Sequence, residues 1–300
     1  MGAKIVCLNP TPKLTFPPSD GFDIEMKIYD ITTLEGNIRR LTSINKPKDV
    51  LKKIAEINVK VVLYYFTFDD GEKAEIAKLL KSYYQKRDIT FFCCSSDSIY
   101  YSSLLLAYVK EYGENVIEDS QTLLIIYDDR KYFKEISARS IEIKKTNDYF
   151  YFDDIEFIED YTLEYSDEKF KKKFIKTSTV FVYFEECISG PNAHQKHTFD
   201  LIAAKIKDKT IRIINEDIMY FENDAITSKV LKYIGKKPFK YDFATISYRK
   251  FILGAFEPWM KTSQDQNFYK NCLISVNPFE ILPLKKTIVF YETFEKIVVC

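Results

Sequence analysis

Short antiparallel strands are predicted for the first 44 residues, because hydrophobic and charged positions alternate there. Ile24, Met26 and Ile28 share one side of such a strand, and pairs that contain proline or glycine supply the turns. Residues 45–57 change to a helical spacing of apolar residues, after an asparagine and a proline that favour the start of a helix. The chain therefore opens with a small sheet followed by a helix.

Strands and helices alternate in the next part of the chain. Three mainly apolar runs predict buried strands, at residues 59–67, 89–94 and 122–127. A helix is predicted after Asp69-Asp70, and another that opens at Asp97 and stops near Gly113. A strand, a helix and a strand in this order are typical of a parallel crossover. We expect the three strands to be neighbours in one mixed sheet or across a junction between lobes.

A second lobe is predicted to begin near residue 132. Aromatic and aliphatic residues alternate with charges up to residue 164, which favours antiparallel strands with one exposed face. The mixed pattern then repeats, with strands at 179–184 and 210–214, a helix at 192–206 and a helix that ends at Gly235. A long helix is predicted for 242–259, followed by two or three short strands between 272 and 299. The sequence has no internal repeat of fixed period.

Composition removes several classes of function. Hydrophobic residues make up 46% of the 300 residues, which is enough for a large core, and 44 basic residues balance 44 acidic ones. A chain without net charge has no overall field that attracts nucleic acid or lipid. No apolar stretch approaches the roughly 20 residues of a membrane span, and the six cysteines form no Cys-x-x-Cys pair. We expect a soluble, cytoplasmic protein with reduced thiols that binds neither membrane nor nucleic acid.

Glycine is scarce and widely spaced. The chain has 8 glycines, and no two of them lie closer than fifteen residues. Dinucleotide-binding turns, P-loops, kinase glycine loops and nucleophile elbows all need two glycines within a few positions. The sequence therefore excludes these four kinds of site.

One segment resembles a known family. Residues 61–73, Val-Val-Leu-Tyr-Tyr-Phe-Thr-Phe-Asp-Asp-Gly-Glu-Lys, resemble without a gap the Val-Val-Thr-Val-Pro-Ala-Tyr-Phe-Asn-Asp-Ser-Gln-Arg stretch of the seventy-kilodalton heat-shock chaperones. Further segments are similar to family elements in the same order, at 45–51, 97–108, 124–128, 230–237 and 244–255. The resemblance implies a shortened, two-lobed, actin-like ATPase fold of the α/β class.

The resemblance also implies domain bounds. Residues 1–265 would form the ATPase-type domain, with lobe I at 1–118 and 241–262 and lobe II at 119–240. Residues 266–300 would form a short β-rich C-terminal extension, far shorter than a substrate-binding domain.

The family holds ATP between two glycine-rich hairpins, with an aspartate that organises Mg²⁺. Here the first hairpin position reads Asn9-Pro10-Thr11-Pro12, without the carboxylate, without the glycine and without the two amide donors that prolines lack. The second keeps Asp128 but continues with Asp-Arg-Lys-Tyr in place of glycines. The vestigial cleft positions are Asn9, Thr11, Asp128, Arg130 and Arg249, the last in place of a glycine of the late helix. The resemblance thus implies a pseudo-ATPase without catalytic residues and without a cofactor.

Other constellations are weaker. His194 and His197, with Cys187 and Asp200 nearby in sequence, could hold a metal, but a solvated helix turn explains the histidines better. Three acidic pairs could bind Mg²⁺ but are explained as caps or turns, at 69–70, 128–129 and 153–154. The basic cluster 169–173 is interpreted as a solvated helix face, and Trp259 as a candidate anchor for a partner. We predict no metal site.

Three functions stay open at this point. The first is a non-catalytic chaperone-like protein, acting as a protein-binding scaffold or chaperone cofactor with a chaperone or a ribosome-associated complex as its partner. The second is an ATP-binding chaperone ATPase with a remodelled cleft, which the glycine count opposes. The third is a structural or regulatory protein without a role in chaperone work, because a lost active site permits any later role.

Overall fold

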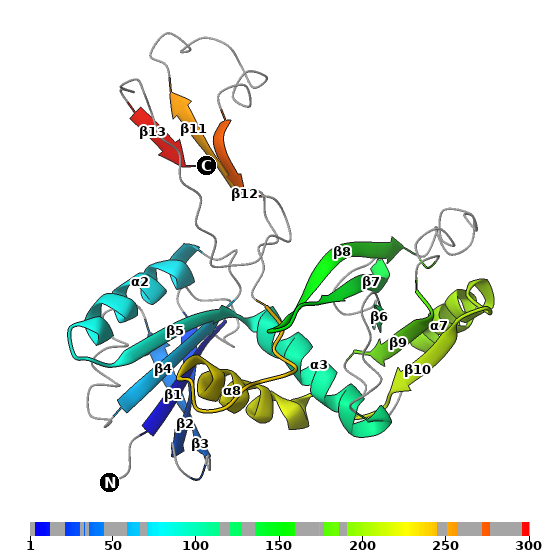
Figure 1. Cartoon of the computed structure of the whole chain (residues 1–300), viewed down its shortest axis with the longest axis horizontal. Coiled ribbons are helices and arrows are strands. Elements are labelled where there is room, and N and C mark those ends of the chain that lie inside the picture. The colour runs from blue at the N-terminus through cyan, green and yellow to red at the C-terminus, as the bar shows by residue number, and fades with distance from the viewer. Residues whose placement is uncertain are drawn as a thin grey trace. The chain divides into compact units, whose positions relative to one another are not determined.

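The computed structural model of the chain describes residues 4–12, 22–30, 33, 36–44, 59–66, 71–113, 121–127, 136–159, 174, 177–185, 191–244, 251–256, 272–276 and 296–299. The chain divides into two compact units, Met1–Phe243 and Ala244–Cys300 (Figure 1). The first unit contains two five-stranded sheets, and the second a three-stranded sheet.

The first sheet has the strand order β3-β2-β1-β4-β5. Its strands are β1 (Lys4–Pro12), β2 (Phe22–Asp30), β3 (Gly36–Ile44), β4 (Val59–Phe66) and β5 (Thr90–Ser95). The first three are antiparallel, and β4 and β5 run parallel to β1. Helix α2 (Gly71–Gln85) connects β4 to β5. The predicted strands, and the helix between β4 and β5, are confirmed; the predicted helix at 45–57 lies outside the described residues.

The second sheet has the strand order β10-β9-β6-β7-β8. Its strands are β6 (Gln121–Ile126), β7 (Ile136–Lys145), β8 (Phe150–Glu159), β9 (Thr179–Phe184) and β10 (Thr210–Ile214). Three antiparallel strands are again followed by two parallel ones. If the five strands of each sheet are numbered in chain order, and the second sheet is taken from β8 to β10, both sheets have the order third, second, first, fourth, fifth. The predicted mixed α/β fold with two sheets is confirmed, and the two sheets share a topology although their sequences show no repeat.

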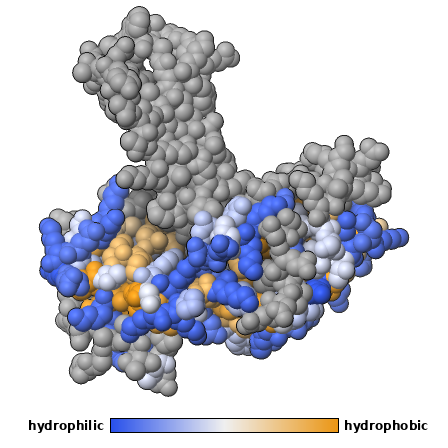
Figure 2. Space-filling view, in the orientation of Figure 1, coloured by the Kyte–Doolittle hydropathy of each residue, from blue (hydrophilic) through white to orange (hydrophobic). Residues whose placement is uncertain are grey.

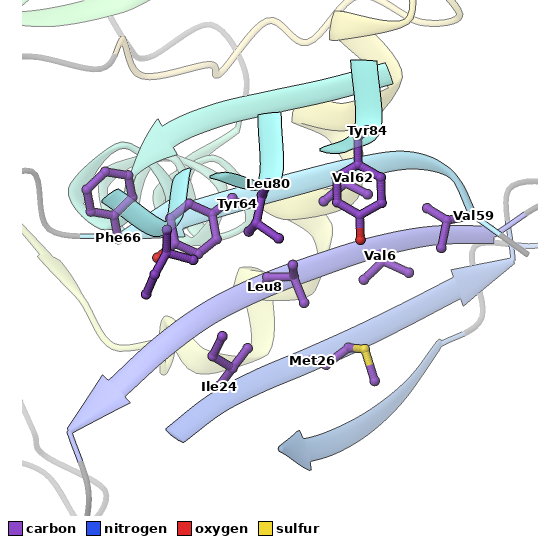
Figure 3. Close-up of a cluster of buried hydrophobic side chains, with 11 residues drawn as sticks. Val6, Leu8, Ile24, Met26, Val59, Val62, Tyr64, Phe66, Leu80 and Tyr84 are labelled. Atoms are coloured by element: carbon purple, nitrogen blue, oxygen red, sulfur yellow. The ribbon is translucent and has the colours of Figure 1, made fainter. Parts of the chain in front are cut away.

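Each sheet is covered on both faces by helices. On the first sheet, α2 packs over alternate residues of β1 and β4 through Ile76, Leu80 and Tyr84 (Figure 3). The other face is covered by α8 (Met219–Tyr233), whose Ala225 and Val230 contact the remaining residues of the same strands. Apart from the exposed Lys60, the side chains of β4 are buried on both faces, as its mainly apolar sequence predicts.

Helices α3 and α8 exchange places between the two sheets. Helix α3 (Ser96–Tyr112) follows the first sheet in the sequence but packs on the second, where the Tyr108 ring centroid lies 4.0 Å from that of Phe181. Helix α8 follows the second sheet and packs on the first. The opposite face of the second sheet is covered by α7 (Ala193–Lys205). Since α3 and α8 also contact each other, they form the junction between the two halves (Figure 1).

Local capping explains where α3 begins and ends. The Ser95 hydroxyl accepts a hydrogen bond from the Ser98 amide at 3.1 Å, which satisfies one free donor of the first turn. Gly113 ends the helix with φ of 88°, a backbone conformation that favours glycine. The predicted bounds of this helix are confirmed to within one residue.

The predicted helix at 242–259 is wrong in both of its described parts, because residues 242–244 are not helical and Phe243 forms an isolated β-bridge with Phe150. Residues Phe251–Phe256 form strand β11, between β12 (Cys272–Val276) and β13 (Lys296–Val299). The run Phe-Ile-Leu-Gly-Ala-Phe is rich in aromatic and branched residues, which favour strands, and its glycine disfavours a helix. The lobe and domain bounds implied by the family resemblance stay predictions.

Candidate functional site

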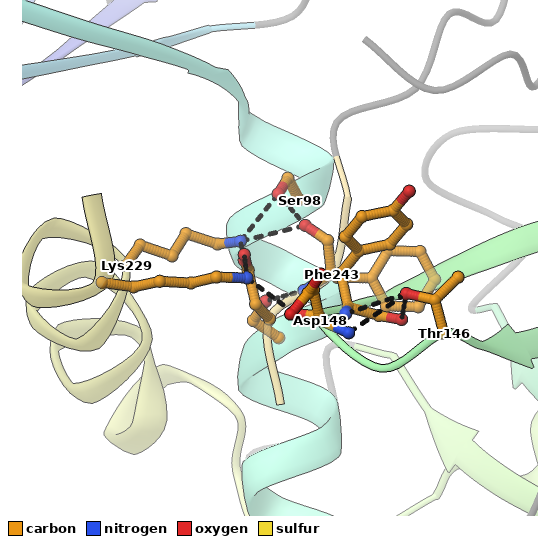
Figure 4. Close-up of polar contacts among 9 residues, drawn as sticks. Ser98, Thr146, Asp148, Lys229 and Phe243 are labelled. Carbon is orange, nitrogen blue, oxygen red and sulfur yellow. Dashed lines mark hydrogen bonds and ion pairs between the residues drawn. The ribbon is translucent and has the colours of Figure 1, made fainter. Parts of the chain in front are cut away.

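A fully buried lysine lies at the junction of α3 and α8. Lys229 of α8 forms an ion pair with Asp242, and both side chains are buried. The Lys229 ammonium also donates to Ser98 Oγ of α3 at 2.8 Å and to the Phe243 carbonyl oxygen at 3.0 Å (Figure 4). All three ammonium donors therefore have an acceptor, which is the condition for keeping a charge buried.

This polar cluster extends to the second sheet. The other carboxylate oxygen of Asp242 pairs with Lys232 Nζ at 2.7 Å, and Lys232 also donates to the Asp148 carbonyl oxygen at 2.6 Å. The Phe150 amide donates to the Asp242 carbonyl oxygen at 2.8 Å. Asp148 lies in the turn between β7 and β8. The cluster thus connects α8 both to α3 and to the second sheet.

Two serines of α3 fix the segment that follows Asp242. Ser98 donates to the Phe243 carbonyl oxygen, and the Phe243 amide donates to Ser102 Oγ at 2.9 Å. Both serines are buried and lie one helical turn apart, so they face the same strip of backbone. We refer to Ser98, Ser102, Lys229, Lys232 and Asp242 as the junction cluster.

A second buried lysine fixes the first turn of α8 to the first sheet. Lys27 of β2 pairs with Glu222 at 3.0 Å and with Glu25 at 3.5 Å. The Tyr65 hydroxyl donates to Glu222 at 3.3 Å, and the Tyr29 hydroxyl donates to Asn223 Oδ1 at 2.8 Å. Helix α8 is therefore held by a buried lysine near each of its ends.

Tyrosines gather at the carboxyl edge of the second sheet, where β6 and β9 end. Ligands of open α/β sheets bind at such edges. The Tyr100 hydroxyl donates to Glu185 Oε1 at 3.4 Å, and Arg139 donates to the Tyr101 hydroxyl at 3.1 Å. The same guanidinium lies 5.5 Å from the ring centroid of Tyr127. We refer to these five residues as the tyrosine cluster.

Burial controls the ionisation of these tyrosines. Loss of hydration raises the pKa of Tyr101 to about 12, with Arg139 opposing the rise. Burial also raises the pKa of Tyr100 and Tyr127 above their usual range, and the Glu185 carboxylate adds to the effect. The three phenols are protonated at neutral pH, so they supply volume and hydrogen bonds rather than a base.

Two of the five vestigial cleft positions lie among the described residues. Asn9 and Thr11 lie in β1, opposite Glu25 and Asp23 of β2, so residues 9–12 belong to a strand rather than a turn. The other three, Asp128, Arg130 and Arg249, lie outside the described residues.

The weaker candidates have these positions. His194 and His197 lie in the first turns of α7, and the His197 side chain is exposed, as the solvated-turn interpretation expects. In the described part of the chain, no three His, Cys, Asp or Glu residues are grouped as metal ligands. In the register of the antiparallel strands β7 and β8, Asp154 lies opposite Glu142. The remaining candidates lie outside the described residues, at Asp69-Asp70, Asp128-Asp129, 169–173, Cys187 and Trp259.

No helix among the described residues is both long and apolar enough to cross a membrane.

The pattern of residues along the chain does not identify the junction cluster as a site. One signal was present, the pair Ser98 and Ser102, which lie one turn apart in a helix whose middle is mainly apolar. Serine disfavours helix interiors unless its hydroxyl has a partner. Lys229 gave no signal, because a lysine on a helix is usually exposed.

Comparison with known proteins gives distant structural likenesses only. No protein-family model and no curated protein matches the sequence. A ROK hexokinase from Thermus thermophilus matches 76% of this chain and 99% of its own, at 9% identity and a TM-score of 0.39. A Ppx/GppA family member from Aquifex aeolicus matches 77% of this chain and 98% of its own, at 10% identity and a TM-score of 0.35. Likenesses this distant assign neither an activity nor a substrate to the chain.

Proposed function

We propose that the chain is a non-catalytic relative of the two-lobed actin-like ATPases and works by binding another protein, as a scaffold or chaperone cofactor. Two features support the class of fold. Both halves have one sheet topology, and each half is covered by a helix from the other half.

The junction cluster carries the proposal. Closure of two lobes around a ligand needs a hinge whose contacts change at low cost. Here the contact between α3 and α8 contains a buried ion pair in which each ammonium donor has an acceptor. Breaking one partner of such a pair costs about 3–5 kcal/mol. A junction of this kind supports a fixed frame rather than a lobe that opens and closes in each catalytic cycle.

The tyrosine cluster supports the absence of nucleotide chemistry. A phosphate-binding edge presents free backbone amides and small residues. At the end of β6 the structure instead places the buried rings of Tyr101 and Tyr127, held against Arg139. In β1, Asn9 supplies an amide where the family resemblance implies a carboxylate for Mg²⁺.

Exposed apolar residues at the start of α8 support protein binding. Met219 is 66% exposed and Tyr220 is 77% exposed, and they are adjacent in the first turn. Large side chains of this kind provide much of the free energy at protein interfaces when a partner buries them. We propose that they contact the partner.

Calorimetry with two ligands tests the proposal. Titration with Mg-ATP to millimolar concentration should give little heat, and titration with a purified seventy-kilodalton heat-shock chaperone should give a saturable signal. The double variant Met219→Ser, Tyr220→Ser should weaken chaperone binding at least tenfold, and Lys196→Ser on exposed α7 surface should not.

The alternatives predict other results. Micromolar ATP affinity, with turnover that Asp128→Ala abolishes, would establish the ATPase with a remodelled cleft. Binding of neither ligand would favour the structural or regulatory protein without a chaperone role.

A further inference from the structure

Strand β5 forms one edge of the first sheet. It pairs with β4 on one side, and no described strand pairs with it on the other. An edge strand presents a row of backbone donors and acceptors away from its neighbour. Proteins usually protect such an edge with lysine, proline or a bulge. The sequence of β5, Thr-Phe-Phe-Cys-Cys-Ser, contains neither lysine nor proline, and its pairing with β4 is regular.

The surface beside this edge is hydrophobic. Cys93 is exposed, and Phe91 and Phe92 are half-buried. Phe92 packs on the α8 face of the sheet, with its ring centroid 4.7 Å from that of Tyr233, and Phe91 packs on the α2 face beside Tyr84. Figure 2 shows an orange area in the part of the surface that α2 and β5 occupy in Figure 1, with blue residues around it.

Basic residues outnumber acidic ones beside β5. Residues 71–95, from the start of α2 to the end of β5, contain five basic residues, Lys73, Lys78, Lys81, Lys86 and Arg87, and three acidic ones, Glu72, Glu75 and Asp88, in a chain whose net charge is zero. Lys78 and Lys81 are exposed on α2. Helix α2, which carries both lysines, packs against β5.

We propose that β5 binds an extended acidic segment of a partner protein, which adds to the first sheet as a further strand. Side chains of an added strand point alternately to the two faces of the sheet. On the α2 face they would meet Cys93 and Lys81, and on the α8 face Phe92 and Tyr233. The segment that fits alternates aspartate or glutamate with hydrophobic residues.

A second copy of the chain fits this edge less well. Antiparallel pairing of two β5 strands about a twofold axis would place two α2 helices on the same face of one continuous sheet. The Lys78 and Lys81 side chains of both copies would then lie near one another, and like charges across such a contact oppose binding. An acidic segment has the opposite charge and meets no such penalty.

A designed peptide tests this inference, which deepens the proposed function by stating the chemistry of what one surface binds. The probe is fluorescein-labelled Ser-Asp-Val-Glu-Phe-Asp-Val-Glu-Ser, and the control peptide has lysine at its four acidic positions. Fluorescence anisotropy with the full chain should show binding of the acidic peptide that weakens as salt is added. The lysine peptide should bind at least tenfold more weakly.

Two variants and one structural readout locate the site. Lys81→Glu should lower the affinity for the acidic peptide at least threefold. Lys196→Glu, the same charge reversal on α7, should leave that affinity unchanged. Hydrogen exchange should slow at the amides of residues 90–95 when the peptide binds, because half of them gain a partner.

Other outcomes overturn the inference. Equal binding of both peptides, or binding without added protection of β5, would show that β5 is not the site. Suppose that the chaperone binds, and that neither ATP nor the acidic peptide binds. In that case the inference fails and the proposed function stands. If the acidic peptide protects β5 while ATP binds with micromolar affinity, the inference stands and the proposed function fails.

Discussion

Gly36 of β3 lies opposite Tyr29 of β2, so close that a Cβ atom at Gly36 would be 2.5 Å from Cδ1 of the tyrosine ring. The ring cannot move away at low cost. Tyr29 is buried against the α8 face of the first sheet, and its hydroxyl donates to Asn223 of α8. The glycine is therefore required by the space that the tyrosine occupies.

We expect Gly36→Ala to lower the free energy of unfolding by about 1–3 kcal/mol, the usual cost of forcing extra volume into packed structure. Urea unfolding measures this cost. Thr33→Ala, in the exposed turn nearby, should cost less, because it inserts no new atom and keeps the backbone amide that donates to Asp30. The cost of Gly36→Ala should shrink when Tyr29 is first changed to alanine. An equal cost in both backgrounds would contradict the contact.

The junction cluster gives the second prediction. Lys229→Met should lower the free energy of unfolding by about 3–5 kcal/mol, because Asp242 remains buried with one of its two ammonium partners gone. The double variant Lys229→Met, Asp242→Leu should cost less than the sum of the single changes, since no unpaired charge is left at the buried position.

Chemical unfolding of the four proteins of this cycle measures the coupling. Lys236→Met, at an exposed lysine just beyond α8, is the matched control and should stay within about 0.5 kcal/mol of the parent. Additive single changes would mean that the two charges do not stabilise each other.

The sequence predicted the elements whose residues are apolar on every face. Strands β4, β6 and β9 have a neighbouring strand on each side, so both of their faces are largely buried and their sequences are mainly apolar. The helix from Ser96 to Tyr112 was predicted because its capping residues and its glycine stop are local signals. Where the chain itself carries the information, pattern analysis was sufficient.

The errors and omissions have a physical cause as well. The six residues of β11 fit either a short strand or part of a helix, because a short apolar run has no period that separates them. The shared topology of the two sheets is invisible in the sequence, since it consists of strand pairings rather than residue identities. Lys229 and Asp242 are thirteen residues apart, and only the fold shows that Ser98 completes their site.

Tyr84 provides the third prediction. Its ring points from α2 into the core of the first sheet, near Val6 and Val59 (Figure 3), and among the described residues its hydroxyl has no hydrogen-bond partner. An unsatisfied buried polar group costs about 1–3 kcal/mol. Tyr84→Phe keeps the ring and removes the hydroxyl, so it should raise the free energy of unfolding by about 1 kcal/mol or more.

Thermal and urea unfolding measure the gain. The matched control is Tyr83→Phe, at the half-buried neighbour. The Arg87 guanidinium carbon lies 3.6 Å from the centroid of the Tyr83 ring, which this change keeps, so stability should change little. A loss of stability in Tyr84→Phe would instead reveal a hydrogen bond to the Tyr84 hydroxyl.

The buried tyrosines make stability depend on alkaline pH. Burial raises the pKa of Tyr29, Tyr65, Tyr100 and Tyr127 above the usual range and that of Tyr101 to about 12. In the unfolded chain these phenols ionise near pH 10. Their contribution to stability is fully present below that value. Above it, the unfolded state releases protons that the folded state keeps, so the free energy of unfolding falls by about 1.4 kcal/mol per pH unit for each such tyrosine.

A titration of phenolate absorbance, followed together with circular dichroism, checks this sign. Of the 22 tyrosines, the exposed ones should ionise near pH 10 while the fold persists, and the buried ones should ionise only as the dichroism signal is lost. Ionisation of all the tyrosines near pH 10 with the dichroism retained would show that these phenols are hydrated in the folded protein. In that case water would reach the tyrosine cluster at the carboxyl edge of the second sheet, and the cluster would no longer oppose nucleotide binding there.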